Sequence, residues 1–263
     1  MFLPGVKHIL AVASGKGGVG KTTVTVNLAL ALAQTGAQVG VYDADLYGPN
    51  VPLMLGVRRK TSRKGMVPAV RAESQPYIRP LERYGLQVMS VGLVLGDAET
   101  VLPDPMFAGH IIRQTLQDTL WGTLDYLLVD FPPGSGEPQQ TLVRTIGWSG
   151  AVIVTTPQDM ALMDTRRSLG LFQAANVPIV GVVENMSYLL CPHCGEQIEV
   201  FDRTDRAWDA ADSNVDLLGR VPMHLTISQR INARHPLVNG AHETPETAPF
   251  REIAHEIVRK YPR

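Results

Sequence analysis

The sequence lacks the features that mark several large classes of protein. No apolar run approaches the roughly 18 residues that a membrane helix needs, and the N-terminal stretch MFLPGVKHIL lacks the charged and cleavable parts of a signal peptide. The net charge is −1, so the composition shows no global bias toward nucleic acid or membranes, and we expect neither as a partner. No internal repeat interrupts the chain, whose 263 residues can bury a substantial core.

Apolar, β-rich runs alternate with helical patterns along almost the whole chain. The predicted strands are Ile9–Ala13, Gln38–Tyr42, Leu86–Val91, Tyr126–Phe131, Ala151–Thr155, Ile179–Glu184 and Val215–Leu218. The predicted helices are Lys21–Gln34, Met106–Trp121, Gln139–Ile146, Leu162–Ala174, Arg203–Asp212 and Phe250–Tyr261, the last with an apolar stripe that packs on the sheet. Continuous apolar strands separated by helices favour a parallel sheet covered on both faces. We therefore predict an α/β fold, a single three-layer domain over residues 1–263 with a mostly parallel sheet flanked by helices.

The most specific motif is a phosphate-loop pattern near the N-terminus. Residues 15–22 read GKGGVGKT, which fits the spacing G-x-x-x-x-G-K-[S/T]. The glycines let backbone N–H groups turn inward around a phosphate, Lys21 reaches the β and γ phosphates, and the hydroxyl of Thr22 holds Mg²⁺. The motif predicts a nucleoside triphosphate site. Only two cysteines accompany it, so the expected compartment is a reducing cytoplasm.

Further charged residues occur where a phosphate site needs them. Lys16 lies inside the loop, and a cation there can reach a phosphate on a facing subunit. Asp43 and Asp45 follow a strand at the edge where open α/β sheets bind ligands, and they can orient water and a hydrated metal. Asp130 ends an apolar strand, the usual position of a carboxylate that holds Mg²⁺, often through water. The alternatives are a solvated lysine and aspartates that only cap turns or helices.

The two cysteines lie together in Cys191-Pro192-His193-Cys194-Gly195. This pattern is half of a thiolate metal site, in which Pro and Gly shape the turn. One chain cannot complete a site of four cysteines, but two chains can if a two-fold axis brings the loops together. Four interpretations stay open: a [4Fe–4S] cluster shared across a homodimer, zinc in the same place, a redox-active disulfide, and a pair without a ligand. We predict a metal loop inserted at about residues 187–201.

The patterns K-G-G-x-G-K, D-A-D and D-x-P-P-G together resemble the deviant phosphate-loop ATPases, which include the nitrogenase iron protein, the Min and Par ATPases and the Mrp/ApbC carriers. The chain is most similar to the Mrp/ApbC carriers, through runs spread over nearly its whole length: PGVKHILAVASGKGGVGKTT, DADLYGPNVPLMLG, DFPPGSGE, VVENMSYLLCPHCG and LGRVP. The resemblance implies a phosphate-loop NTPase architecture of the Rossmann-like type. One departure is Leu102-Pro103-Asp104, where the family often has Trp-Arg-Gly.

The resemblance also implies a role for each candidate residue. Lys16 would act across a dimer interface, Asp45 would position the attacking water with Asp43 beside it, and Asp130 would hold Mg²⁺ through water. The implied nucleotide-binding residues are Gly15, Lys16, Gly17, Gly18, Val19, Gly20, Lys21, Thr22, Thr23, Asn185 and Pro222, with Thr22 also on Mg²⁺. Asn185 and the loop Arg220-Val221-Pro222 resemble the elements that recognise adenine.

The function implied by the resemblance is that of a cytoplasmic, homodimeric, slow ATPase. It would bind a [4Fe–4S] cluster between subunits at Cys191 and Cys194 and pass it to apo iron–sulfur proteins. One rival is a switch like the Min and Par proteins, in which ATP-driven dimerisation controls membrane or DNA binding. Only the basic run Arg58–Lys64 supports that rival, and a solvated loop or the tip of a small hairpin is the favoured explanation of this run. A second rival is a zinc-stapled dimer with regulatory ATPase activity, because zinc takes the same ligands.

Overall fold

The computed structural model describes residues 2–46, 48–57, 69–72, 75–95, 105–201, 215–238 and 244–263. Three predicted features fall outside those ranges: the basic run Arg58–Lys64, the departure Leu102–Asp104 and the helix Arg203–Asp212. The candidate site residues all lie inside them.

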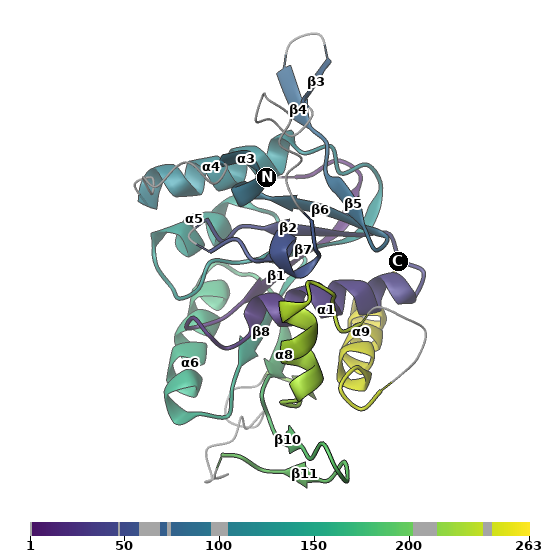
Figure 1. Cartoon of the computed structure of the whole chain (residues 1–263). Helices are drawn as coiled ribbons and strands as arrows, with labels where there is room; N and C mark the ends of the chain where they lie inside the picture. The colour runs from purple at the N-terminus through teal and green to yellow at the C-terminus, as the bar shows by residue number, and fades with distance from the viewer. Residues whose placement is uncertain are drawn as a thin grey trace.

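An eight-stranded sheet forms the centre of the fold, in the order β12-β9-β8-β1-β7-β2-β6-β5 (Figure 1). Its strands are β1 Val6–Ala13, β2 Val39–Asp43, β5 Leu81–Arg83, β6 Leu86–Ser90, β7 Leu124–Asp130, β8 Gly150–Thr155, β9 Ile179–Glu184 and β12 Leu217–Arg220. Neighbouring strands are parallel except β5, which pairs antiparallel to β6 at one edge. The predicted α/β class and mostly parallel sheet are confirmed.

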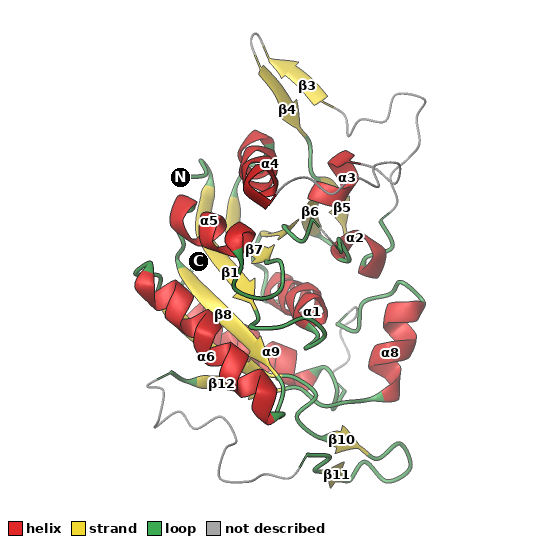
Figure 2. Ribbon diagram, turned by 90° about the vertical axis from the view of Figure 1, so that its left-hand side faces the viewer, coloured by secondary structure: helices red, strands yellow, loops and turns green. Residues whose placement is uncertain are grey.

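Alternate residues of β1 face two separate cores. Leu10 and Val12 belong to the apolar cluster that α1 and α9 cover, whereas Ile9, Ala11 and Ala13 belong to the cluster that α4, α5 and α6 cover. These helices are α1 Lys21–Gln34, α4 Pro105–Asp118, α5 Glu137–Thr145, α6 Asp159–Ala174 and α9 Ala248–Lys260. Figure 2 shows the sheet between the two helix layers. The predicted three-layer arrangement is therefore confirmed, with both faces of the sheet buried.

The C-terminal helix α9 packs through the apolar stripe that the sequence shows. Phe250, Ile253 and Ile257 are fully buried, in the cluster shared with α1. The apolar stripe is therefore buried in the core rather than exposed on the surface, as predicted. Searched over the described residues, no helix has both the length and the hydropathy of a membrane span.

Two of the predicted elements, α1 and β9, have the observed bounds, and the others that fall within the described residues differ at their ends. The strand predicted at Val215–Leu218 is shifted to β12, because the pairing with β9 extends to Arg220 opposite Glu184. Short elements escaped prediction: α2 Val51–Met54, β3 Ala69–Ala72, β4 Gln75–Ile78, β5, α3 Val91–Leu95, β10 Leu189–Leu190, β11 Gln197–Ile198 and α8 Leu225–Asn232. The hairpins β3–β4 and β10–β11 lie at opposite ends of the molecule in Figure 1.

Candidate functional site

The register of the parallel strands brings two distant aspartates side by side. β7 lies between β1 and β2, and Asp130 at its end pairs with Val12 of β1 and with Asp43 of β2. Both carboxylates therefore lie at the carboxyl edge of the sheet, next to the loop that follows β1. The predicted phosphate site and the predicted aspartates meet at this edge.

The phosphate loop connects β1 to α1 and holds the whole predicted set Gly15, Lys16, Gly17, Gly18, Val19, Gly20, Lys21, Thr22 and Thr23. Gly20 precedes the helix with φ of 81°, in the left-handed region that favours glycine. A Cβ on Gly20 would lie 2.2 Å from Nδ2 of Asn185, the residue after β9. This close approach also favours glycine at position 20. Gly20 has no side chain to cap the helix, and the first-turn N–H groups of α1 can face an anion.

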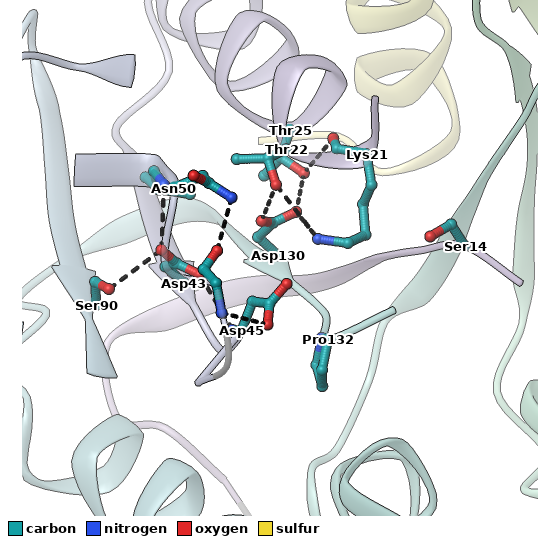
Figure 3. Close-up of polar contacts among 12 residues, drawn as sticks. Ser14, Lys21, Thr22, Thr25, Asp43, Asp45, Asn50, Ser90, Asp130 and Pro132 are labelled. Carbon is teal, nitrogen blue, oxygen red and sulfur yellow. Dashed lines mark hydrogen bonds and ion pairs between the residues drawn. The ribbon is translucent and has the colours of Figure 1, made fainter. Parts of the chain in front are cut away.

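Asp130 is the centre of a buried polar cluster (Figure 3). Its Oδ1 is 2.8 Å from Nζ of Lys21 and accepts a hydrogen bond of 2.7 Å from the hydroxyl of Thr25. Its Oδ2 accepts a hydrogen bond of 2.7 Å from the hydroxyl of Thr22. Lys21 is 6% exposed and Asp130 is fully buried, so each charge depends on the other for its stability in the core.

Asp43 and Asp45 differ in what surrounds them. The carboxylate of Asp43 is fully buried and accepts hydrogen bonds from the backbone N–H groups of Asp45 and Val51 and from the hydroxyl of Ser90. Burial raises the pKa of Asp43 well above its ordinary value, and the charge of Asp130 raises this pKa further, while Lys21 opposes both. Asp43 therefore connects the end of β2 to the end of β6 and to the start of α2.

Asp45 is 8% exposed and accepts a hydrogen bond from the N–H of Gly48. Figure 3 shows Asp45 beside Asp43, at the same end of the sheet as the cluster of Asp130 and Thr22. The hydroxyl and carboxylate oxygens gathered here are the hard ligands that Mg²⁺ takes in proteins, so the residues present fit this metal.

The strand ends on either side of the phosphate loop also contact it. Nζ of Lys16, which is half-buried, lies 3.3 Å from Oε1 of Gln158, after β8. The amide of Asn185, after β9, donates a hydrogen bond of 2.8 Å to the carbonyl of Val19. Pro222 is buried beside Val221, whose N–H donates to the carbonyl of Glu184. Asn185 and Gln158 thus contact the phosphate loop directly, whereas Pro222 is connected to it through Val221, Glu184 and Asn185.

The loop after β7 is held in place by a side chain of α5. The amide nitrogen of Gln139, which is 4% exposed, donates to the carbonyls of Pro132 and Pro133. The N–H of Gly134 donates to the carbonyl of Ser14, at the start of the phosphate loop. The Pro-Pro-Gly turn therefore contacts the phosphate loop directly.

Both cysteines lie in the turn of a small hairpin. We use the name cysteine hairpin for residues 187–201, which include β10 and β11. Within it the N–H of Cys191 donates to the carbonyl of Glu196 and that of Gly195 donates back to Cys191. Cys191 is half-buried and Cys194 is exposed, and both are free thiols. Figure 1 places the hairpin at the edge of the molecule.

The hairpin turn favours the thiolate form of one cysteine. Backbone N–H groups of Cys194 and His193 and the thiol of Cys194 lower the pKa of Cys191 below its ordinary value. The thiolate is the form that binds a metal, so this site suits metal binding. Within the described ranges no group of three or more Cys, His, Asp or Glu side chains gathers as a metal site, so one chain offers only the pair.

Several residues of the two sites were not found from the sequence. They are Thr25 and Ser90, which bind the two aspartates, and Gln139 and Gln158, which contact the loops. Arg220 was expected as part of an adenine-recognising loop, but its contacts with Glu184 and Glu199 were not predicted. Thr25 lies one helical turn after Thr22, and this spacing on one face of α1 is the signal that could have revealed it.

Comparisons with known proteins agree with this geometry. A family model described as "NUBPL iron-transfer P-loop NTPase" (ParA) matches residues 5–258. The iron–sulfur cluster carrier protein of Salmonella typhimurium is 43% identical over 256 residues, which cover 96% of this chain and 66% of the carrier. The chain thus spans slightly less than two thirds of that relative's length.

Solved structures share the fold over nearly the whole chain. A nucleotide-binding protein from Archaeoglobus fulgidus in complex with ADP is 31% identical and superposes with a TM-score of 0.74, covering 92% of this chain and 91% of that one. The cell division ATPase MinD of Pyrococcus furiosus is 27% identical with a TM-score of 0.68, covering 97% of this chain and 99% of that one.

Proposed function

The chain belongs to the family of NUBPL-type iron-transfer P-loop NTPases, and from this premise we propose that it is an ATP-hydrolysing iron–sulfur cluster carrier. In this proposal, two copies of the chain bind a [4Fe–4S] cluster between them at Cys191 and Cys194 and pass it to apo iron–sulfur proteins. Membership in a P-loop NTPase family implies nucleotide hydrolysis. The slow rate, the cytoplasmic location and the action of residues 1–263 as a single domain are parts of the proposal.

The nucleotide half of the proposal assigns roles to the residues around Asp130. Lys21 and the N–H groups of the loop hold the phosphates of ATP. Thr22 and Asp130 would hold Mg²⁺, which when bound supplies positive charge to the phosphate oxygens. Asp45 orients the attacking water, because Asp43 already uses its carboxylate to bind Ser90 and the backbone.

Lys16 completes the nucleotide site in the proposal from the other subunit. Within its own chain the ammonium group lies against Gln158 at the rim of the loop, half-buried. A cation at that rim can stabilise the charge that develops on a phosphate facing it. ATP then favours a closed dimer, and hydrolysis or release reopens it. Asn185 and Pro222 contact the adenine.

The cargo half depends on one observation, the pair of free thiols in the turn of a hairpin that starts two residues after Asn185. Two thiolates per chain make half of the ligand set of a [4Fe–4S] cluster, and a two-fold axis supplies the other half. Cys194 is exposed and Cys191 is half-buried, so a recipient protein can reach a cluster bound there. This access is what a carrier needs.

Anaerobic reconstitution with iron and sulfide tests the proposal. We expect about four irons and four sulfides per dimer, with a visible absorption band that is lost when Cys191→Ala and Cys194→Ala are combined. His193→Ala is the matched control, since it changes the same turn but leaves both thiols. One zinc per dimer without iron uptake would replace the carrier with the zinc-stapled dimer.

A second candidate, a Min-like switch, is favoured by the likeness to MinD over 97% of the chain. It predicts ATP-dependent binding of the protein to anionic vesicles or DNA, with the double cysteine variant binding as well as the wild type. If neither iron nor zinc is taken up and such binding is measured, the switch is the better proposal.

A further inference from the structure

The guanidinium of Arg220, at the end of β12, connects two carboxylates from different segments. Its Nε lies 3.3 Å from Oε1 of Glu184 and donates a hydrogen bond of 2.7 Å to the hydroxyl of Ser187. Its Nη2 donates to both carboxylate oxygens of Glu199, at 3.2 and 3.3 Å. The same group lies 5.2 Å from the centre of the Tyr188 ring. One side chain thus contacts both ends of the segment that carries the cysteines.

These contacts hold the two arms of the cysteine hairpin against each other. Glu184 ends β9 and is 3% exposed, so it belongs to the fixed body of the sheet. Glu199 follows β11 on the returning arm and is 42% exposed. The hairpin's own ladder is short, since β10 and β11 have only two residues each. The bond to Arg220 therefore connects the returning arm to the fixed body of the sheet.

The fixed end of this chain of contacts reaches the phosphate loop. Glu184 is followed by Asn185, whose amide donates to the carbonyl of Val19 at 2.8 Å. The carbonyl of Glu184 accepts a hydrogen bond from Val221, the residue after Arg220. The backbone of Glu184 and Asn185 thus connects the phosphate loop to Val221, the neighbour of Arg220. A displacement of the phosphate loop is transmitted to Arg220 through these bonds.

We propose that Arg220 is a positioning residue that couples nucleotide binding to the orientation of the cysteine hairpin. The path runs from Val19 through Asn185 and Glu184 to Arg220, and from there to Glu199. The proposal rests on the proposed nucleotide site, and it adds a regulation of the cysteine pair. The planar fork of Arg suits it to this task, because it binds two carboxylates at once in a fixed geometry.

Hydrogen–deuterium exchange of the 263-residue chain, with and without Mg-ADP, tests this coupling. ADP is used because it lacks the γ phosphate that favours the closed dimer in the proposal. Light scattering checks that the molecular mass, and so the oligomeric state, stays constant when ADP is added. In the wild type we expect ADP to slow exchange in the hairpin peptide 188–201 by about 5-fold. In Glu199→Ala this slowing is lost, while the phosphate-loop peptide 14–24 remains slowed by ADP.

Glu256→Ala is the matched control, because Glu256 is 43% exposed and pairs with Arg259 on α9, far in the sequence from the hairpin. It keeps the wild-type response. Arg220→Lys is a second variant, since an ammonium keeps the charge beside Glu184 but cannot span both carboxylates. We expect it to reduce the response of the hairpin as Glu199→Ala does.

A wild-type response of the hairpin in both Glu199→Ala and Arg220→Lys would overturn the proposal. So would a wild-type hairpin that does not respond when the phosphate-loop peptide does. The measurement needs no bound cluster, so its failure is distinct from a failure of the reconstitution experiment. A phosphate-loop peptide that ignores ADP would overturn the nucleotide site and this coupling together.

Discussion

The polar side chains at the carboxyl edge of the sheet are buried. Each is at most 6% exposed and is hydrogen-bonded or ion-paired to another of them or to the backbone; they are Lys21, Thr25, Asp43 and Asp130. In the cysteine hairpin, by contrast, Cys194 is exposed and the supporting ladder is two residues long. The difference matches the chemistry proposed for each region. Phosphate transfer needs fixed charges in a water-poor site, whereas a carried cluster must be reached by another protein.

The largest effect expected from this comparison is at Lys21. Lys21→Met leaves the buried carboxylate of Asp130 without its cation, which should cost about 3–5 kcal/mol of unfolding free energy, measured by urea denaturation without nucleotide. ATP hydrolysis should fall by about 100-fold or more. Combining it with Asp130→Asn should restore most of the stability but none of the ATPase activity. A double variant no more stable than the single one would contradict the buried pair.

A smaller effect is expected at Gly20. Gly20→Ala forces an alanine to φ of 81° and pushes its Cβ against the amide of Asn185, so we expect a loss of about 1–3 kcal/mol and weaker nucleotide binding. Gly18→Ala is the matched control, with φ of 82° and nothing within 4 Å of its Cβ. Equal losses of unfolding free energy in the two variants would mean that the contact with Asn185 does not contribute to the effect of Gly20→Ala.

The smallest effect on stability is expected in the hairpin, where the observable is a titration. In Cys194→Ser the remaining thiol of Cys191 keeps its backbone donors, so its alkylation by iodoacetamide should stay fast to a lower pH than that of a free thiol, whose pKa is about 8.5. The same variant in strong urea is the control, because unfolding removes the donors. Identical midpoints for the folded and unfolded protein would contradict the lowered pKa.

The sequence predicted those parts of the site that depend on neighbouring residues. The loop and α1 follow from the local spacing of glycine and lysine, and their bounds were correct. Thr25 and Ser90 were missed because their partners, Asp130 and Asp43, are 105 and 47 residues away. A serine in a strand carries no sign of such a partner, and the only sign for Thr25 is its position one helical turn after Thr22.

The cysteine hairpin shows a second limit of prediction. The motif itself indicated a metal loop, but strands of two residues are too short for any periodicity to reveal. Arg220 was grouped with the adenine-recognising loop by resemblance, and no local pattern indicates that its side chain binds Glu184 and Glu199. The role of Asn185 and Pro222 in binding adenine stays a prediction.

The position of β1 in the sheet has a consequence for how the chain is made. Both neighbours of β1, β7 and β8, come more than a hundred residues later in the sequence, since Val6 pairs with Leu124 and Leu10 with Gly150. During synthesis the first strand therefore remains without a neighbouring strand, and apolar, until β7 has left the ribosome. Chaperones can bind the exposed apolar strand during that interval, and the phosphate loop acquires Asp130 only at its end.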